Sequence, residues 1–447
     1  MWREHPYLRR AALALIGFLA GLWLMGCGAS AQYTLTEGVG AAPALPPPDS
    51  SLIPVINVVS AKGWANGRTP APVVGTNVNA FARDLDHPRW LYVLPNGDVL
   101  VAETNAPVRP DDNTSIRGRF VKHYQQKAGG AVPSANRITL LRDADGDGVA
   151  EVRTPFITNL NSPFGMALVG TTLYVADTDA ILRFTYREGE TTITDAGVKV
   201  VDLPAGPRNH HWTKNVVAAP DGSKLYVAIG SNSNVAENGI DEERDRAMIW
   251  EVDPRTGAHR VFASGLRNPV GMAWEHGALW VAVNERDELG SDLVPDYMTA
   301  VRDGAFYGWP YSYWGAHVDT RVTPQRPDLV EAAIAPDYAL GPHTASLGLA
   351  SASGNSLGDT FREGMFVGQH GSWNRKPRSG YKVIFVPFAN GRPSGKPIDV
   401  LTGFVEDNGD AHGRPVGVAV DRRGALLVAD DVGNTVWRVA AIVAPSR

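Results

Sequence analysis

A pair of histidines precedes a short apolar segment in the run His210-His211-Trp212-Thr213-Lys214-Asn215-Val216-Val217. A neutral imidazole accepts a proton near pH 7, so His211, which lies next to the expected strand, is a candidate general base. His210 is one position further from the strand, and we expect it only to hydrogen-bond a loop carbonyl. The motif therefore predicts proton abstraction by His211.

Two further motifs supply cations and amides. Arg267 can bind a carboxylate through two parallel hydrogen bonds, and the adjacent Asn268 can donate to a carbonyl or a hydroxyl. A second loop provides an aromatic plate and three cations for clamping a flat, anionic cofactor, in the run His370-Gly371-Ser372-Trp373-Asn374-Arg375-Lys376-Pro377-Arg378. An ordinary turn is the alternative for Arg267 and Asn268. A solvated basic loop is the alternative for Lys376 and Arg378.

An acidic turn has the spacing of a cation site. Its carboxylates alternate around glycines and can converge on one hard cation, for which calcium is the natural candidate. The four candidate ligands are Asp143, Asp145, Asp147 and Glu151. A full EF-hand loop would need a carboxylate where Thr154 stands, so the pattern is closer to a shorter calcium hairpin. A solvated acidic turn is the alternative, and we expect an occupied site to be structural.

These motifs belong to a repeated unit, which must position them. Each unit is a strand, a turn with Gly or Asp-Gly, and a second alternating strand, which is the signature of a β-hairpin. The copies start near residues 88, 163, 211, 269, 342 and 415. Their spacing of roughly 50 to 75 residues suits a four-stranded sheet with its loops. We therefore predict an all-β fold, a six-bladed β-propeller, with an open β-sandwich array as the alternative.

Propeller geometry predicts which of these residues become neighbours. The inner strand of every blade starts at the same end of the central channel, so the residues that open the repeats form a ring there. They are His87, Arg89, Asn161, Ser162, His210, His211, Arg267, Asn268, His343, His412 and Arg414. Turns prefer Gly, Asn, Asp and Ser, whereas this ring carries titratable bases and fixed cations. The ring predicts a site for an anionic ligand and a proton transfer.

The composition restricts the class of protein. The 447 residues allow several domains or one large closed β architecture. Lys and Arg number 42 against 47 Asp and Glu, which gives a net charge of −5 and argues against a basic nucleic-acid binder. The single Cys excludes an internal disulfide and a Cys-based zinc cluster. We expect a small-molecule partner and no nucleic acid.

The N-terminus resembles a bacterial lipoprotein signal. Basic residues at Arg3, Arg9 and Arg10 precede an apolar run over 11–25 that is too short for a comfortable span, and Cys27 follows directly after Gly26. We predict that residues 1–27 are a signal peptide and that Cys27 carries the lipid. An uncleaved anchor and an ordinary secretory peptide are the alternatives.

The predicted domains follow from this signal. Residues 28–60 contain the run Ala44-Leu45-Pro46-Pro47-Pro48-Asp49 and are expected to form a flexible, Pro-rich tether. Residues 61–447 are expected to form the catalytic propeller. We expect an exported protein, periplasmic or at the cell surface, whose contact with the membrane is the lipid on Cys27.

The sequence resembles the soluble quinoprotein sugar dehydrogenases, most of all the sorbosone and aldose dehydrogenases related to soluble glucose dehydrogenase. The resemblance covers most of residues 75–442 and rests on Gly265-Leu266-Arg267-Asn268-Pro269-Val270-Gly271-Met272-Ala273, Phe306-Tyr307-Gly308-Trp309-Pro310, and His211 ahead of its strand. It implies a six-bladed propeller with pyrroloquinoline quinone (PQQ), which has three carboxylates, over the channel mouth beside a calcium ion. The implied activity is oxidation of an aldose or sorbosone-like sugar, with electrons passing to an external acceptor.

The resemblance also implies residue roles. His211 matches the base that takes the proton of the sugar's anomeric hydroxyl while a hydride passes to the quinone. Arg267 matches the cation that stabilises the developing oxyanion. Asn268 and Arg414 match cofactor contacts. The chain departs from the family's pattern at Asn215, where an arginine is usual, at His210, where an acidic residue is usual, and at 284–288, where Gly-Pro carbonyls are usual.

Two other functions remain compatible with a propeller. A calcium-dependent lactonase or hydrolase needs carboxylates and Asn on a metal, whereas the predicted ring is mainly His and Arg. A non-catalytic propeller that binds a glycan or a protein is the other alternative. The sequence contains no dinucleotide fingerprint, no Walker loop, no haem-attachment Cys pair and no Gly-x-Ser-x-Gly elbow.

Overall fold

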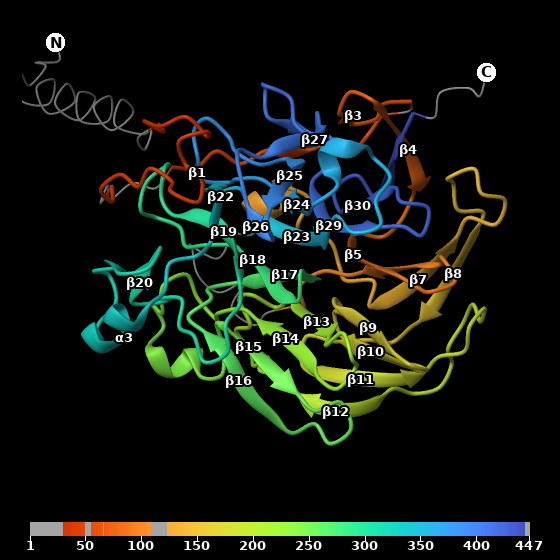
Figure 1. The fold of residues 1–447 in the computed structure, drawn as a ribbon, viewed down its shortest axis with the longest axis horizontal. Helices are drawn as coiled ribbons and strands as arrows, with labels where there is room; N and C mark the ends of the chain where they lie inside the picture. Colours follow the sequence, from red (N-terminus) through yellow and green to blue (C-terminus); the bar gives the residue numbers. More distant parts are fainter. Residues whose placement is uncertain (1–29, 50–54, 66, 109–122, 443–447) are drawn as a thin grey trace, which may run out of the picture.

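The computed structural model describes residues 30–49, 55–65, 67–108 and 123–442. Its strands form sheets arranged around a central axis, and the first and last sheets along the chain lie next to each other (Figure 1). The predicted six-bladed β-propeller is confirmed. None of the helices in the described part has the length and hydropathy needed to cross a bilayer.

Blades one to three are four-stranded antiparallel sheets of consecutive strands. Blade one consists of β5 (Pro88–Val93), β6 (Val99–Glu103), β7 (Arg137–Arg142) and β8 (Val152–Ile157). Blade two consists of β9 (Met166–Val169), β10 (Thr172–Ala176), β11 (Ala180–Thr185) and β12 (Val198–Asp202). Blade three consists of β13 (Lys214–Ala218), β14 (Leu225–Ile229), β15 (Met248–Val252) and β16 (His259–Ser264).

Blades four and five carry insertions and extra edge strands. Blade four consists of β17 (Pro269–Glu275), β18 (Ala278–Val283), β19 (Pro295–Ala300) and β22 (Tyr338–Pro342). Its insertion holds β20 (Ser312–Tyr313), β21 (His317–Val318) and α3 (Pro327–Ala332). Blade five consists of β23 (Ser346–Ser351), β24 (Gly364–Gln369), β25 (Lys382–Ala389) and β27 (Ile398–Thr402).

Blade six closes the ring by combining one strand that precedes blade one with three strands that follow blade five. It consists of β29 (Pro415–Val420), β30 (Leu426–Asp430), β31 (Thr435–Ala441) and the early strand β4 (Thr76–Ala82). β4 pairs antiparallel with β31, with Val78 opposite Val439. A continuous antiparallel ladder therefore joins the two parts of the chain.

The innermost strands β5, β9, β13, β17, β23 and β29 contact their neighbours around the channel. A Cβ on Gly348 would lie 2.1 Å from the carbonyl oxygen of Val416, and one on Gly165 would lie 2.3 Å from the amide nitrogen of Val216. Both contacts join adjacent blades, the first between β23 and β29 and the second between the residue before β9 and β13. Only glycine permits this approach, which explains why glycine recurs in the repeat.

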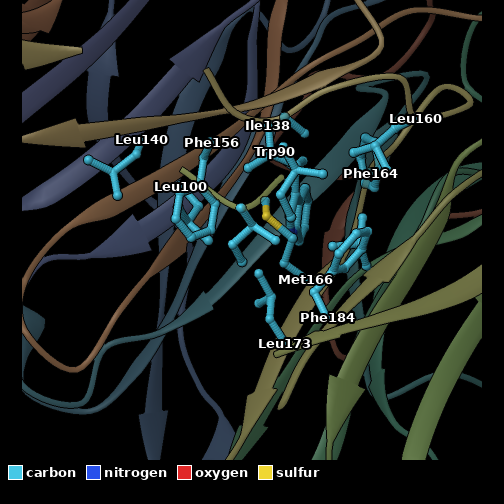
Figure 2. Packing of buried hydrophobic residues seen from close by; sticks show 14 of the residues in the cluster. Trp90, Leu100, Ile138, Leu140, Phe156, Leu160, Phe164, Met166, Leu173 and Phe184 are labelled. Atoms are coloured by element: carbon cyan, nitrogen blue, oxygen red, sulfur yellow. The ribbon is translucent and has the colours of Figure 1, made fainter. Parts of the chain in front are cut away.

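The core lies between the blades. Aromatic and aliphatic side chains of blades one and two interlock, with the rings of Trp90 and Phe164 4.9 Å apart (Figure 2). The second strand of a blade, such as β14, is buried along its whole length, because sheets pack on both of its faces. Such strands are continuously apolar rather than alternating.

The channel ends in a hollow of about 420 Å³ on the side away from the predicted ring of His and Arg. All six inner strands line it, toward their C-terminal ends, at Val93, Leu168, Ala218, Ala273, Ser351 and Val420. We call this the distal end and the opposite one the mouth. The shared lining confirms that the six repeats surround a single channel.

The segment before β4 lies against blades four to six in its described parts. β1 (Val39–Gly40) pairs with β22, β2 (Ser60–Ala61) pairs with β28 (Asp410–Ala411), and β3 (Ala71–Pro72) pairs with β27. Backbone pairing with strand edges holds this segment where a free tether is predicted, because each edge offers unpaired donors and acceptors.

Candidate functional site

The mouth is built from residues that precede each inner strand and residues that follow each second strand. The two kinds of segment meet because neighbouring antiparallel strands run in opposite directions. The structure brings the predicted residues into two connected groups. His211, Arg267 and Asn268 lie on blades three and four, while His87, Arg89, His370 and Arg414 surround a carboxylate on blade six.

His211 is half-buried and held by the end of β14. Its Nδ1 lies 2.9 Å from the Ser231 carbonyl oxygen and 2.9 Å from the Ser231 hydroxyl. The carbonyl only accepts, so Nδ1 carries the hydrogen and, in the neutral ring, the lone pair is on Nε2. This is the tautomer that a base acting through Nε2 requires.

Arg267 and Asn268 lie against His211. A Cβ on Gly230 would meet Asn268 Oδ1 at 2.4 Å and the Cβ of His211 at 2.5 Å, so the two side chains flank this glycine. The Arg267 carbonyl accepts a hydrogen bond from the amide of Ser231 at 2.7 Å. The structure thus joins the predicted base to the predicted Arg-Asn pair.

The guanidinium of Arg267 is buried and bound to protein oxygens. It donates to the Glu285 carbonyl at 2.7 Å and to Asn234 Oδ1 at 3.0 Å, and it lies 3.5 Å from Asp287. These bonds hold Arg267 against the loop that departs from the family's pattern. Its position is therefore fixed before any ligand binds.

Asp287 joins the loops of blades four and five. It accepts a hydrogen bond from Asn374 Nδ2 at 2.8 Å, and it lies 3.3 Å from His343 Nδ1. Burial raises the pKa of Asp287, but the combined lowering by His343, Arg267 and Asn374 is larger. The pKa therefore lies below its ordinary value. The ionised carboxylate then holds the two loops together.

Asp431 is the centre of the second group. Its carboxylate lies 2.7 Å from Arg89 Nη1, 2.9 Å from His370 Nε2 and 3.5 Å from His87 Nε2. Burial opposes ionisation, but the hydrogen bond with His370 and the charge of Arg89 hold the pKa of Asp431 far below its ordinary value. This carboxylate is ionised and gathers residues from blades one, five and six.

The two histidines of this group are neutral at pH 7. Burial lowers the pKa of His87 to about 4, with Asp431 opposing the shift and Arg89 adding to it. Burial likewise lowers the pKa of His370 to about 3, and Arg414 adds to the effect. Neutral rings leave Arg89 and Arg414 as the fixed positive charges of this side of the mouth.

An aromatic side chain links the two groups. The guanidinium carbon of Arg89 lies 5.9 Å from the ring centroid of Trp212, the residue after His211. Trp212 in turn packs edge-on against Phe164, with ring centroids 6.1 Å apart. His211 and the Asp431 group therefore face one mouth, and the core of blades one and two supports them.

Arg414 is buried beside the loop over 370–380. It donates to the carbonyls of His370 and Gly371, both at 2.9 Å, and its guanidinium carbon lies 5.4 Å from the ring centroid of Tyr381. The predicted cofactor arginine thus lies at the mouth.

Trp373 and Arg375 lie elsewhere on this loop. Arg375 is 1% exposed and donates to the Ser291 and Pro377 carbonyls and to Asp292, so it holds loops together. Trp373 is 42% exposed. Their predicted contact with a cofactor stays a prediction. His412 bonds Glu406 at 2.9 Å and lies outside both groups.

Several buried polar atoms at the mouth have no hydrogen-bond partner within the described residues, and three of them belong to the predicted ring. They are Asn268 Oδ1, Arg89 Nε and His87 Nε2. Buried polar atoms are normally satisfied, and groups left unpaired at a mouth are those that a ligand can complete. The set offers an amide oxygen, a guanidinium NH and an imidazole nitrogen to a polar, anionic ligand.

The acidic cluster lies at the distal end, in the turn between β7 and β8. Ligand atoms of Asp143, Asp145, Asp147 and Glu151 all lie within 4.8 Å of one another. Arg423 donates to Asp143 at 2.7 Å, so a bound cation would displace or share this contact. The structure gathers the four predicted ligands and separates them from the mouth by the length of an inner strand.

Sequence reasoning missed the two carboxylates that organise the mouth, Asp431 and Asp287. It also missed Lys214, which is fully buried behind His211 and whose pKa burial places well below its ordinary value. A polar residue directly after a predicted second strand, as in Ala429-Asp430-Asp431, is the signal that could have identified the first of them.

Comparison with known proteins agrees with this architecture. A family model described as TrAA12-like matches residues 134–301 and 324–441. A pyrroloquinoline quinone-dependent pyranose dehydrogenase of Coprinopsis cinerea is 25% identical over 369 residues, which cover 72% of this chain and 44% of that protein. An uncharacterized protein of Borreliella burgdorferi is 27% identical over 241 residues, which cover 53% of this chain and 62% of that protein. The chain thus spans less than two thirds of either relative.

A solved structure shares the fold. The holo form of the pyranose dehydrogenase PQQ domain from Coprinopsis cinerea superposes with a TM-score of 0.65 at 21% identity, covering 86% of this chain and all of that domain. The resemblance to quinoprotein sugar dehydrogenases is confirmed at the level of the family. Because the family model matches more than half of its residues, the chain belongs to the TrAA12-like family.

Proposed function

We propose that the chain is a PQQ-dependent oxidoreductase that oxidises an aldose or a sorbosone-like sugar. The observation that carries the proposal is the tautomer of His211. Its Nδ1 hydrogen is directed to the Ser231 carbonyl at 2.9 Å, which puts the lone pair on Nε2 at a mouth lined with buried cations. The relative of known activity in Coprinopsis cinerea supports the same chemistry.

The mouth suits a planar cofactor with several carboxylates. Arg89 and Arg414 are fixed cations that can bind carboxylates, and the unpaired Arg89 Nε is a buried donor that such a group can satisfy. Asn268 lies beside the base, where an amide can donate to a carbonyl oxygen. Bound there, PQQ would supply the acceptor for the hydride that the sugar loses.

The chain's own residues perform the proton chemistry. His211 Nε2 accepts the proton of the sugar hydroxyl, and the Ser231 carbonyl keeps the ring oriented through Nδ1. The imidazolium that forms then donates from both nitrogens. The buried Arg267 provides a fixed positive charge beside the base, which stabilises negative charge that develops in the transition state.

The test is a titration of the apo-protein with PQQ, followed by dye reduction with a panel of aldoses. We expect saturable absorbance changes and sugar-dependent reduction only with PQQ present. Lactone hydrolysis without PQQ-stimulated turnover would instead establish the hydrolase alternative. Absence of both activities would leave a non-catalytic propeller and overturn the proposal.

We further propose that the protein is exported and attached to a membrane through a lipid on Cys27. This proposal rests on the basic, apolar and small-residue pattern that ends at Cys27, which lies outside the described residues. Mass analysis of the N-terminal peptide, with Cys27→Ala as the control, tests the attachment. An unmodified cysteine would contradict it.

A further inference from the structure

Two neighbouring segments on the mouth side of the propeller each carry an exposed apolar side chain. Trp373 is 42% exposed and Ile56 is 50% exposed. The amide of Asn57, the residue after Ile56, donates to the Trp373 carbonyl at 2.7 Å, which places the two segments side by side. The exposed cation Lys376 lies on the same loop. We call Ile56, Trp373 and Lys376 the rim patch.

The N-terminal segment enters the described structure at this patch. The amide of Ala31 donates to the Lys376 carbonyl at 2.7 Å, and the amide of Gln32 donates to Asp292 Oδ2 at 2.6 Å. Arg375 bonds the same Asp292 at 3.2 Å and the Tyr33 carbonyl at 3.3 Å. The start of the segment is thus fastened to the loop by several bonds.

Chain length limits the distance between the patch and Cys27. Only four peptide units separate Cys27 from Ala31, and a fully extended chain of that length spans about 14 Å. A lipid on Cys27 would therefore keep Lys376 close to the bilayer surface in every orientation of the intervening residues. The distal end is separated from the mouth by about 20 Å, the length of the inner strand β23.

We propose that the rim patch lies on the phospholipid surface to which Cys27 is attached, so that the channel mouth opens toward the membrane. The inference rests on the proposed lipid attachment and adds an orientation to it. Tryptophan side chains prefer the interface between headgroups and acyl chains, where Ile56 can also bury its side chain. Lys376 can pair with headgroup phosphates.

The experiment uses the full-length, lipid-attached protein in vesicles. A thiol-reactive bimane is placed by Lys376→Cys at the patch and, as the matched control, by Ser353→Cys at the distal end. Both native side chains are exposed, so both variants should fold. A lipid-bearing Cys27 has no free thiol and stays unlabelled. Emission is compared in vesicles of brominated and ordinary phospholipids.

We expect brominated lipid to lower the emission of the Lys376→Cys label at least about twofold and to leave the Ser353→Cys label unchanged, since only the patch reaches the interface. Equal quenching at both positions, or none at the patch, overturns the proposed orientation. Mass analysis of the N-terminal peptide accompanies the measurement. An unacylated Cys27 would overturn both the lipid attachment and the orientation that rests on it.

Dye reduction on the same vesicles keeps the catalytic proposal separate. Quenching at the patch with no PQQ-dependent turnover would overturn the proposed activity and leave the orientation intact. Turnover without quenching would overturn the orientation and leave the proposed activity intact.

Discussion

At the scale of single residues, the mouth depends on carboxylates that keep basic groups in defined states. Asp431 is ionised and bonds Arg89 and His370, while burial keeps His87 and His370 neutral. Sequence reasoning identified the basic residues because they open each repeat. It missed Asp431, although a polar residue directly after a second strand was an available signal. It could not identify Asp287, because contacts between loops of different blades leave no periodic pattern.

Replacement of His211 by alanine tests the base. We expect His211→Ala to lower turnover by about two to four orders of magnitude, because proton transfer loses its acceptor. PQQ binding, followed by absorbance, should be largely retained. His276→Ala is the control, since His276 is 48% exposed at the distal end, in the turn between β17 and β18. Unchanged turnover in His211→Ala would remove this residue from the reaction.

The neutral state of His87 predicts a pH effect on stability. The folded pKa of about 4 lies below the ordinary 6.5, so the unfolded chain binds the proton more tightly. Stability from this histidine is therefore complete above pH 6.5 and is lost as the pH falls toward 4. His87→Asn should remove that loss, which is about 3 kcal/mol at 1.36 kcal/mol per pKa unit.

Urea unfolding at pH 7 and pH 4 measures this effect. Asparagine suits the substitution because His87 has φ 55, a conformation that asparagine tolerates. His276→Asn, at an exposed histidine with φ 47, is the matched control. The idea is wrong if His87→Asn loses as much stability between the two pH values as the unchanged protein.

At the scale of elements, the inner strands follow directly from the sequence, and the connections do not. The repeated Pro-Val-Gly pattern predicts strands that start at residues 269 and 415, where β17 and β29 begin. The fold of the insertion in blade four and the contacts of residues 30–49 and 55–65 were not predictable. Their positions depend on which strand edges and loops remain unpaired, and that is decided only in the folded molecule.

The glycines of the inner strands give a sharp prediction. Gly348→Ala should destabilise the fold by about 3 kcal/mol or more, because its Cβ would lie 2.1 Å from the Val416 carbonyl and backbone atoms cannot turn aside. The matched control is Gly130→Ala, where the nearest atom lies at 3.7 Å. Denaturant midpoints compare the two, and equal midpoints would contradict the close packing of the blades.

The interlocking side chains of blades one and two also support the site. Phe164 is fully buried between Trp90 and Trp212. Phe164→Ala should cost about 3 to 5 kcal/mol and, by releasing Trp212, should lower turnover in the protein that remains folded. Val198→Ala, on the exposed edge strand β12, is the control. Normal turnover in a destabilised Phe164→Ala protein would separate packing from function.

At the scale of the whole molecule, the propeller keeps the mouth and the acidic cluster of Asp143, Asp145, Asp147 and Glu151 at opposite ends. Calcium at one hundred times its Kd would stabilise the fold by about 2.7 kcal/mol. We expect calcium to raise the melting temperature, the double variant Asp145→Asn with Asp147→Asn to abolish that shift, and sugar turnover to remain unchanged in this variant.

Arg423 provides the control for this prediction. Because it donates to Asp143 at 2.7 Å, it competes with a cation for the same oxygen, and Arg423→Gln should tighten calcium binding. Calorimetry of both variants measures the affinity. A melting temperature that does not respond to calcium in the unchanged protein would leave the cluster as a solvated acidic turn.

The ladder between β4 and β31 has a consequence for biogenesis. Ribosomes release β4 before blades one to five and β31 after them, so the earlier strand must wait unpaired while five blades are synthesised. An export route that moves an unfolded polypeptide through a pore is compatible with this order, because blade six cannot form before β31 is present to pair with β4. Chains that stall before residue 435 would lack the partner strand altogether and become substrates for quality-control proteases.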